Sequence, residues 1–239
     1  MADFFKRSEF LKTINLDSRL SLVASFVRKG SRVADIGTDH AYIPVYLVQT
    51  GVSPSAVAAD LRKMPLENAK KTIEQYNLSS KISTVLSDGL DGIEKSCCDD
   101  IVIAGMGGML IAEILSKSNR IYDKRLRLVL QPMSHQEDVR KFLFENGFEI
   151  VEEGCSFDKK HCYCVIAAEF TGEKKEYSPA MIYTGTLYKR KDESAKVYLA
   201  NQLSRLTKRR DSLEKAGTSP AEVESLSEII NDYKKLTED

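Results

Sequence analysis

Short apolar runs alternate with helix-forming stretches between residues 31 and 170, and this alternation constrains the fold more than any other feature of the chain. Strands that alternate with helices are typical of a mostly parallel sheet with helices on both faces. The runs are RVADIG, AVAADL, ISTVLSDGL, DIVIAGMGG and LRLVLQP, starting at Arg32, Ala56, Ile82, Asp100 and Leu126. The sequence therefore predicts a doubly wound α/β fold.

Two later runs close the predicted sheet. FEIVEEGCSFD from Phe148 and HCYCVIAAEF from His161 leave no room for a helix between them. Parallel strands need a long crossover, whereas antiparallel strands can join through a short turn. We therefore expect an antiparallel hairpin at the end of the sheet.

After Phe170 a polar stretch, GEKKEYSP, leads to two long helical patterns. The first carries a narrow apolar seam of coiled-coil type, formed by Leu199, Leu203, Leu206 and Leu213. Gly217 is expected to end this helix. Ser219 has the residue type of an N-cap, followed by Pro220 at the first helical position and Glu222 in a capping box. The second seam consists of Val223, Leu226, Ile230 and Tyr233.

The chain is thus predicted to divide at the polar stretch. Residues 1–172 form the sheet domain, and residues 173–239 form an antiparallel helical pair. The leucine seam packs either inside this pair or against a second copy of the chain. Two helices packed on each other are the simpler arrangement, so we expect a monomer.

Composition limits the cellular setting. Hydrophobic residues make up 42% of the chain, enough for a real core, but no window approaches the roughly 20 apolar residues that span a bilayer. The five cysteines (Cys97, Cys98, Cys155, Cys162 and Cys164) contain no CxxC pair. We expect reduced thiols in a cytoplasmic protein with no membrane partner. The zero net charge argues against a uniformly basic nucleic-acid binder.

The first predicted strand runs into the turn DIGTDHAYIP, residues 35–44. In an open α/β sheet, ligands bind outside the carboxyl ends of the strands, and Gly37 lets a ligand approach the backbone there. Asp39 stands where a dinucleotide-binding turn has its second glycine. Asp35 and Asp39 would repel a pyrophosphate and suit a cationic ligand. The turn therefore favours S-adenosylmethionine (AdoMet), with its ammonium and sulfonium, over NAD.

The next strands also end in residues suited to this cofactor. Asp60 is placed to accept hydrogen bonds from both ribose hydroxyls. Asp88 is placed to accept one from an adenine amino group, and Gly89 lets the backbone come close. In the turn IAGMGG, the carbonyl of Ala104 or Gly105 can face the amino-acid end of the cofactor or the target base. After the fifth strand, Gln131 and Pro132 project toward the same crevice.

Together these motifs resemble the bacterial TrmK family of tRNA (adenine-N1)-methyltransferases. DIGTDHAYIP, IAGMGG, LQP, LDSRL near the start and the helical tail carry the resemblance, which covers nearly the whole chain. It implies a Rossmann-like class I AdoMet methyltransferase domain with a C-terminal helical domain, acting on the adenine at tRNA position 22. The residues implied to line the cofactor are Asp35, Gly37, Asp39, His40, Asp60, Asp88 and Gly89. The chain departs from the family at Thr38, where serine is common, and at Met133 and Ser134 after the LQP turn.

The resemblance also suggests which residues act in catalysis. Asp39, Gln131 and the turn at 104–108 are implied to lie near the reacting atoms, and His40 is a further catalytic candidate. N1 of an unpaired adenine has a free lone pair, so the reaction mainly needs in-line placement against the sulfonium methyl. Asp39 would stabilise the cationic product or take a proton from the exocyclic amine. The base must first be exposed from the tRNA.

Contacts with tRNA are predicted in two regions. Residues 185–215 carry a surplus of Lys and Arg over acids, which attracts phosphates. The candidates are Arg205, Arg209 and Arg210 in the tail, and Arg19, Tyr42, Met106 and Gly107 near the crevice mouth.

Each of these assignments has an alternative. Asp35 and Asp60 could cap helices, His40 could donate to a backbone carbonyl, and Tyr42 could pack under its turn. The basic tail could be a solvated surface. His161 with the cysteines at 162 and 164 could suggest a metal, but alternating cysteines on a strand more often pack in a core, so no metal is expected. The competing functions are an NAD(P)-dependent oxidoreductase and a catalytically silent RNA-binding adaptor.

Overall fold

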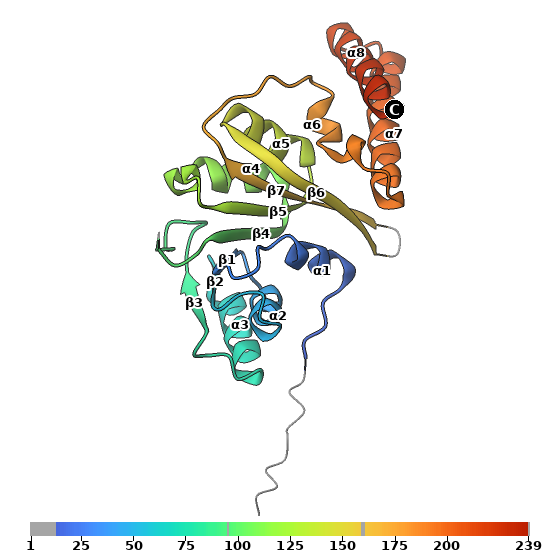
Figure 1. The fold of residues 1–239 in the computed structure, drawn as a ribbon. Helices are drawn as coiled ribbons and strands as arrows, with labels where there is room; N and C mark the ends of the chain where they lie inside the picture. Colours follow the sequence, from blue (N-terminus) through green and yellow to red (C-terminus); the bar gives the residue numbers. More distant parts are fainter. Residues whose placement is uncertain (1–12, 95, 159–160, 239) are drawn as a thin grey trace, which may run out of the picture.

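The computed structural model describes residues 13–94, 96–158 and 161–238, which fold around one seven-stranded sheet (Figure 1). Its strand order is β3-β2-β1-β4-β5-β7-β6. The strands are β1 (Val33–Ile36), β2 (Ala56–Asp60), β3 (Ile82–Leu86), β4 (Asp100–Gly107), β5 (Arg127–Ser134), β6 (Phe148–Asp158) and β7 (His161–Phe170). The first five are parallel, and β7 pairs antiparallel with both β5 and β6. The predicted sheet and its closing hairpin are confirmed.

Helices cover both faces of this sheet, as the alternating pattern predicts. They are α1 (Ser18–Ser25), α2 (Tyr42–Gln49), α3 (Lys63–Gln75), α4 (Gly108–Ser116), α5 (Gln136–Glu145), α6 (Met181–Thr184), α7 (Glu193–Ala216) and α8 (Pro220–Thr237), with short 3-10 turns at Asn119–Tyr122 and Leu187–Lys189. One apolar cluster joins α1, α2 and α3 to one sheet face, and a second joins α4, α5 and the tail to the other. Neighbouring strand residues such as Val33 and Ala34 fall in different clusters because successive side chains point to opposite faces. Within the described residues no helix is long and apolar enough to cross a membrane.

The tail is an antiparallel pair, α7 and α8, whose apolar seams face each other. Leu206 and Tyr233 are buried between the helices, and the Tyr233 hydroxyl donates to the Leu199 carbonyl at 2.8 Å. Gly217 ends α7 in the left-handed region at φ 65°, as expected. The capping box is wrong: Ser219 is itself left-handed and its side chain caps nothing.

A buried ion pair fastens the tail to the sheet. Arg140 of α5 is fully buried and donates from Nε to Glu153 Oε1 of β6 at 2.7 Å. Its other nitrogens donate to the carbonyls of Ile182 and Tyr183 at 3.1 Å and to the Tyr198 hydroxyl of α7 at 3.2 Å. One guanidinium therefore holds α5, β6, α6 and α7 together.

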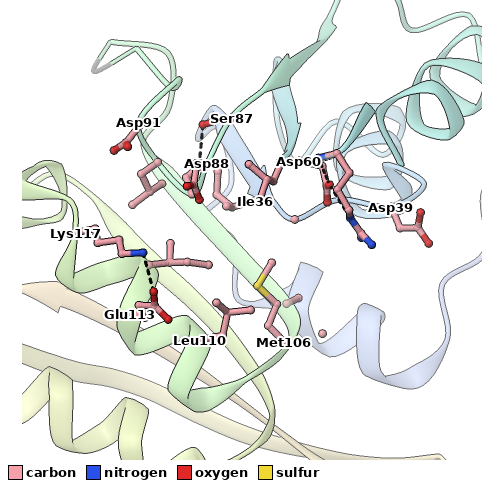
Figure 2. Close-up of a pocket in the computed structure, with 18 residues that line it drawn as sticks. Ile36, Asp39, Asp60, Ser87, Asp88, Asp91, Met106, Leu110, Glu113 and Lys117 are labelled. Carbon is pink, nitrogen blue, oxygen red and sulfur yellow. Dashed lines mark hydrogen bonds and ion pairs between the residues drawn. The ribbon is translucent and has the colours of Figure 1, made fainter. Parts of the chain in front are cut away.

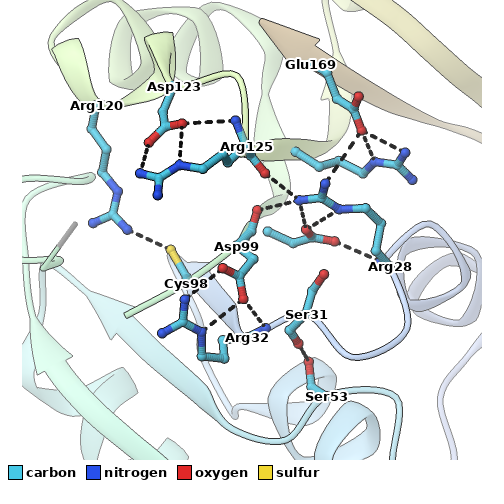
Figure 3. Close-up of polar contacts among 12 residues, drawn as sticks. Arg28, Ser31, Arg32, Ser53, Cys98, Asp99, Arg120, Asp123, Arg125 and Glu169 are labelled. Atoms are coloured by element: carbon cyan, nitrogen blue, oxygen red, sulfur yellow. Dashed lines mark hydrogen bonds and ion pairs between the residues drawn. The ribbon is translucent and has the colours of Figure 1, made fainter. Parts of the chain in front are cut away.

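The amino-terminal edge of the sheet is tied by several ion pairs (Figure 3). Arg28 contacts Asp100 at 2.6 Å, and Arg32 contacts Asp99 at 2.7 Å. The hydrogen bond from Arg32 lowers the pKa of Asp99 to about 2. This edge is occupied by structural contacts, which leaves the carboxyl-terminal edge for ligands.

Candidate functional site

A cavity of about 530 Å³ lies over the carboxyl ends of the parallel strands (Figure 2). It sits at the switch point of the sheet, where β1 pairs with β2 on one side and β4 on the other. Its lining residues are Ile36, Gly37, Asp39, Asp60, Leu61, Arg62, Ser87, Asp88, Gly89, Leu90, Asp91, Ala104, Gly105, Met106, Leu110, Glu113, Ile114 and Lys117. Seven of the predicted cofactor residues are in this wall, namely Gly37, Asp39, Asp60, Asp88, Gly89, Ala104 and Gly105. Asp35 and His40 line the adjoining cavity instead.

The glycine after β1 is required by its surroundings. Gly37 has φ +76°, and a Cβ added there would overlap the methyl group of Met106. Met106 thus fills the space above Gly37 and lines the main cavity. The sequence analysis predicts Met106 as an RNA contact. In the structure it lines the main cavity, where the cofactor is predicted to bind.

The carboxyl groups of Asp35 and Asp60, at the ends of β1 and β2, do not act as helix caps. Asp35 is buried, and loss of solvent raises its pKa to about 6, against the hydrogen bond with Thr38. The helix that follows, α2, has no side-chain cap. Asp60 Oδ1 accepts the backbone N–H of Arg62 at 2.7 Å and lies 3.4 Å from Nε of the same arginine. In the described part of the chain no donor contacts Asp60 Oδ2. Both carboxyls therefore remain available to a ligand.

The opposite wall is apolar and comes from α4. Leu110 and Ile114 line the cavity one helical turn apart. An ion pair of 2.7 Å between Glu113 and Lys117 closes the far end. Sequence reasoning missed this wall, although apolar residues four apart directly after the glycine turn are a usable signal.

A second cavity, of about 520 Å³, adjoins the first. The two share Gly37, Asp39, Ala104 and Gly105 in their lining. The second is otherwise bounded by α1, with Arg19, and by the turn that carries His40 and Tyr42. Ligands in the two cavities would therefore come together at the two turns that carry these shared residues.

Asp39 stands at this junction with its side chain 64% exposed. Its Oδ2 lies 3.4 Å from His40 Nε2, and the His40 ring stacks on Tyr42 at 5.1 Å between centroids. In the described residues His40 contacts this carboxylate and this ring rather than a backbone carbonyl. Tyr42 is 43% exposed, so it does not pack under its turn.

Gln131 is not placed to contact a ligand. It is fully buried and lines neither cavity. Its Oε1 accepts from Arg19 Nη1 at 2.8 Å and from the Gly105 N–H at 3.1 Å. The predicted direct catalytic role is corrected by this burial, and Gln131 becomes a positioning residue for Arg19 and the Gly105 turn.

The remaining RNA candidates lie outside both cavities. Gly107 is next to Ser134, away from the lining. The tail arginines all have carboxylate partners: Arg205 pairs with Glu137 at 2.8 Å, Arg209 with Glu222 at 2.6 Å and Arg210 with Asp211 at 2.5 Å. Their charge is partly offset before any RNA binds. Within residues 13–94, 96–158 and 161–238, no group of three or more His, Cys, Asp or Glu could hold a metal.

Comparison with known proteins agrees with this geometry. A methyltransferase domain family model matches residues 16–166. The chain is 35% identical over 177 residues to the tRNA (adenine(22)-N(1))-methyltransferase of Bacillus subtilis strain 168, covering 74% of each chain. The solved structure of the Bacillus subtilis tRNA methyltransferase TrmK superposes with a TM-score of 0.83 at 29% identity, covering 93% of this chain and 99% of that one. A Streptococcus pneumoniae protein in complex with S-adenosyl-L-methionine gives a TM-score of 0.76 at 32% identity, covering 93% and 100%.

Proposed function

This chain belongs to the family of tRNA (adenine(22)-N(1))-methyltransferases, and on that premise we propose that it transfers the methyl group of AdoMet to N1 of the adenine at position 22 of tRNA. The observation that carries the proposal is the pair of cavities that share Gly37, Asp39, Ala104 and Gly105. The main cavity takes the adenosine part of the cofactor, the amino-acid end of the cofactor reaches Asp35 in the second cavity, and the exposed base enters from that second cavity. The oxidoreductase alternative is not favoured, because Asp35 and Asp39 suit a cation at this turn and a relative binds S-adenosyl-L-methionine.

The residues of the main cavity fit AdoMet in size and chemistry. A volume of about 530 Å³ lies within the usual range for small-molecule sites, roughly 300–1,000 Å³. Asp60 would hold the ribose hydroxyls through its unpartnered Oδ2, and Asp88 would accept from the adenine amino group. Leu110 and Ile114 would cover the adenine face. Asp35 lies in the adjoining cavity, where its buried carboxyl would favour the cationic amino-acid end of the cofactor.

AdoMet supplies an electrophilic methyl group on sulfur, and the chain supplies placement and charge. N1 of adenine needs no strong base, so the main task of the shared wall is to align the base with that methyl. Asp39 stands where positive charge develops on the base. Its exposed carboxylate would stabilise that charge or accept a proton from the exocyclic amine, and His40 would orient it through the 3.4 Å contact.

The RNA contacts in the proposal are Arg19, Tyr42 and the basic side of α7. Tyr42 is exposed and already stacks on His40, so its ring is placed to stack on the flipped base. The proposal also includes a monomer that works in the cytoplasm without a metal. The inward packing of the tail seams supports the monomer, which size exclusion with light scattering would test.

The deciding experiment is mass spectrometry of nucleosides from unmodified tRNA incubated with the protein and AdoMet. We expect 1-methyladenosine from the wild type and a strong loss with Asp39→Ala. Asp39→Asn, which keeps the shape and removes the charge, separates electrostatics from packing. A different methylated base would refute the substrate, and equal product from both variants would remove Asp39 from catalysis.

A further inference from the structure

Three of the five cysteines, Cys155, Cys162 and Cys164, meet on one face of the β6–β7 hairpin. Cys155 lies directly opposite Cys164 in the antiparallel register, and Cys162 precedes Cys164 by two residues on β7. Because side chains two residues apart on a strand share a face, all three thiols pack into the apolar cluster on the tail side of the sheet. None of them lines either cavity, so the methyl-transfer site does not use them.

The thiols of this three-cysteine cluster also contact one another. Cys155 shares hydrogen bonds with the thiols of both Cys162 and Cys164, and these bonds raise the pKa of Cys155 far above its usual range. The bond from Cys155 lowers the pKa of Cys162. Cys155 and Cys162 are half-buried, whereas Cys164 is fully buried. Cys162 is therefore accessible to a small solute and ionises more readily than an ordinary cysteine, which makes it the nucleophile of the cluster.

The strand register suits one pair of these cysteines for a disulfide. Residues directly opposite each other on antiparallel strands have Cα atoms about 4.5–5.5 Å apart, which is inside the range of about 4.4–6.8 Å that disulfides span. Cys155 and Cys164 are such a pair. Diagonal neighbours, such as Cys155 and Cys162, are about 7–8 Å apart, which is beyond that range without a shift of the backbone. The thiol that reacts first and the pair that links best are therefore not the same residues.

We propose that the three-cysteine cluster is an oxidation site for hydrogen peroxide, and that its stable product is a Cys155–Cys164 disulfide. The Cys162 thiolate attacks a peroxide oxygen, the O–O bond breaks, and the departing hydroxide takes up a proton, which leaves water and a sulfenic acid on Cys162. The Cys155 thiol then displaces a second water from that sulfur and forms a Cys155–Cys162 disulfide.

Exchange completes the reaction. Cys164 attacks the sulfur of Cys155, which forms the opposed disulfide and returns Cys162 to a thiol. Arg140 Nη2 donates to Cys164 Sγ at 3.4 Å and is placed to stabilise the attacking thiolate. In total two thiols are oxidised, and one peroxide is reduced to two waters.

The test treats the full chain with equimolar hydrogen peroxide, blocks the remaining thiols, and measures tryptic peptides by mass spectrometry. Two lysines lie between Cys155 and Cys162 in the sequence, so any disulfide from Cys155 to β7 joins two peptides. We expect this joined pair in wild type, its loss after dithiothreitol, and no joined pair in Cys155→Ser. Cys97→Ser removes a half-buried thiol outside the hairpin and should oxidise like wild type.

Two further variants test the order of the steps. Cys162→Ser should form the joined pair about tenfold or more slowly, because the reactive thiolate is gone. Cys164→Ser keeps an acceptor for Arg140 and should stop at the Cys155–Cys162 disulfide. Dithiothreitol should reduce that disulfide about tenfold or more faster than the wild-type bond, because its geometry is strained. Cys98 is an internal control that should stay reduced, since burial raises its pKa to about 12.

Three outcomes would overturn the proposal. Wild type that gives sulfinic or sulfonic cysteines and no joined pair has no second thiol within reach of the first. Equal rates of oxidation in wild type and Cys162→Ser show that peroxide does not enter at Cys162. A disulfide from Cys155 to Cys97 or Cys98, or one that links two chains, shows that the thiols reacted outside the folded hairpin.

Discussion

Asp35 is a buried carboxyl group on the wall of the second cavity, and burial raises its pKa to about 6. A cationic ligand stabilises the ionised form, whereas the free protein is largely protonated below pH 6. Binding below that pH must therefore release a proton. We expect AdoMet affinity to be level above pH 7 and to fall by up to about tenfold per unit below pH 6. Calorimetry across pH 5–8 checks this, and Asp35→Asn should bind more weakly with no such dependence.

Gly37 allows a prediction with a matched control. Gly37→Ala places a side chain at φ +76° against Met106, which must move into the main cavity. Gly30→Ala has the same kind of strain at φ +89° but meets nothing within 4 Å. Both should lose about 1–2 kcal/mol of unfolding free energy. Only Gly37→Ala should also lose AdoMet affinity; equal affinity in the two variants would contradict the close approach.

At the scale of elements, the buried Arg140–Glu153 pair joins the tail to the sheet. Arg140→Met leaves Glu153 buried without its partner, which should cost about 3–5 kcal/mol in a denaturant titration. The double variant Arg140→Met with Glu153→Leu removes both charges and should cost less than the single variant. A double variant that is no better would show that the hydrogen bonds to α6 and Tyr198 outweigh the unpaired charge.

Helix α7 carries the second group of residues that the sequence predicts to contact tRNA. Reversing Arg209 and Arg210 to glutamate should weaken tRNA binding and leave AdoMet binding unchanged, because no residue of α7 lines either cavity. The carboxylate partners of these arginines should keep the loss small. Reversing Lys124 and Arg125 is the control for net charge. Equal tRNA affinity in all three proteins would remove α7 from the RNA contact.

The positions of the strands, and of most acidic residues at the cavity wall, could be predicted because both follow from short stretches of sequence. Apolar runs give strands, and a polar residue after a run lies at the ligand edge. The roles that failed depend on distant pairing. Gln131 is buried because Arg19 and Gly105 reach it from elsewhere in the fold, and the capping box failed because Ser219 takes a left-handed conformation.

At the scale of the whole molecule, one apolar cluster runs from the sheet into the tail. The boundary at residues 172–173 remains a prediction about domains, and the cluster gives a way to test it. A fragment of residues 1–172 would expose Arg140 and the apolar face that α7 covers. We expect it to unfold at lower denaturant than the full chain and to bind AdoMet more weakly. A fragment of unchanged stability would mean that the tail is an independent domain.

The oxygen atom that Gln131 offers to both Arg19 and Gly105 has a consequence for how the two substrates influence each other. A ligand that immobilises Arg19 also immobilises the Gly105 peptide, which lines both cavities. Binding in one cavity therefore changes the conformational entropy that binding in the other cavity still has to remove. Thermodynamic linkage makes any such influence mutual: the factor by which nucleic acid changes the affinity for the methyl donor equals the factor by which the donor changes the affinity for nucleic acid.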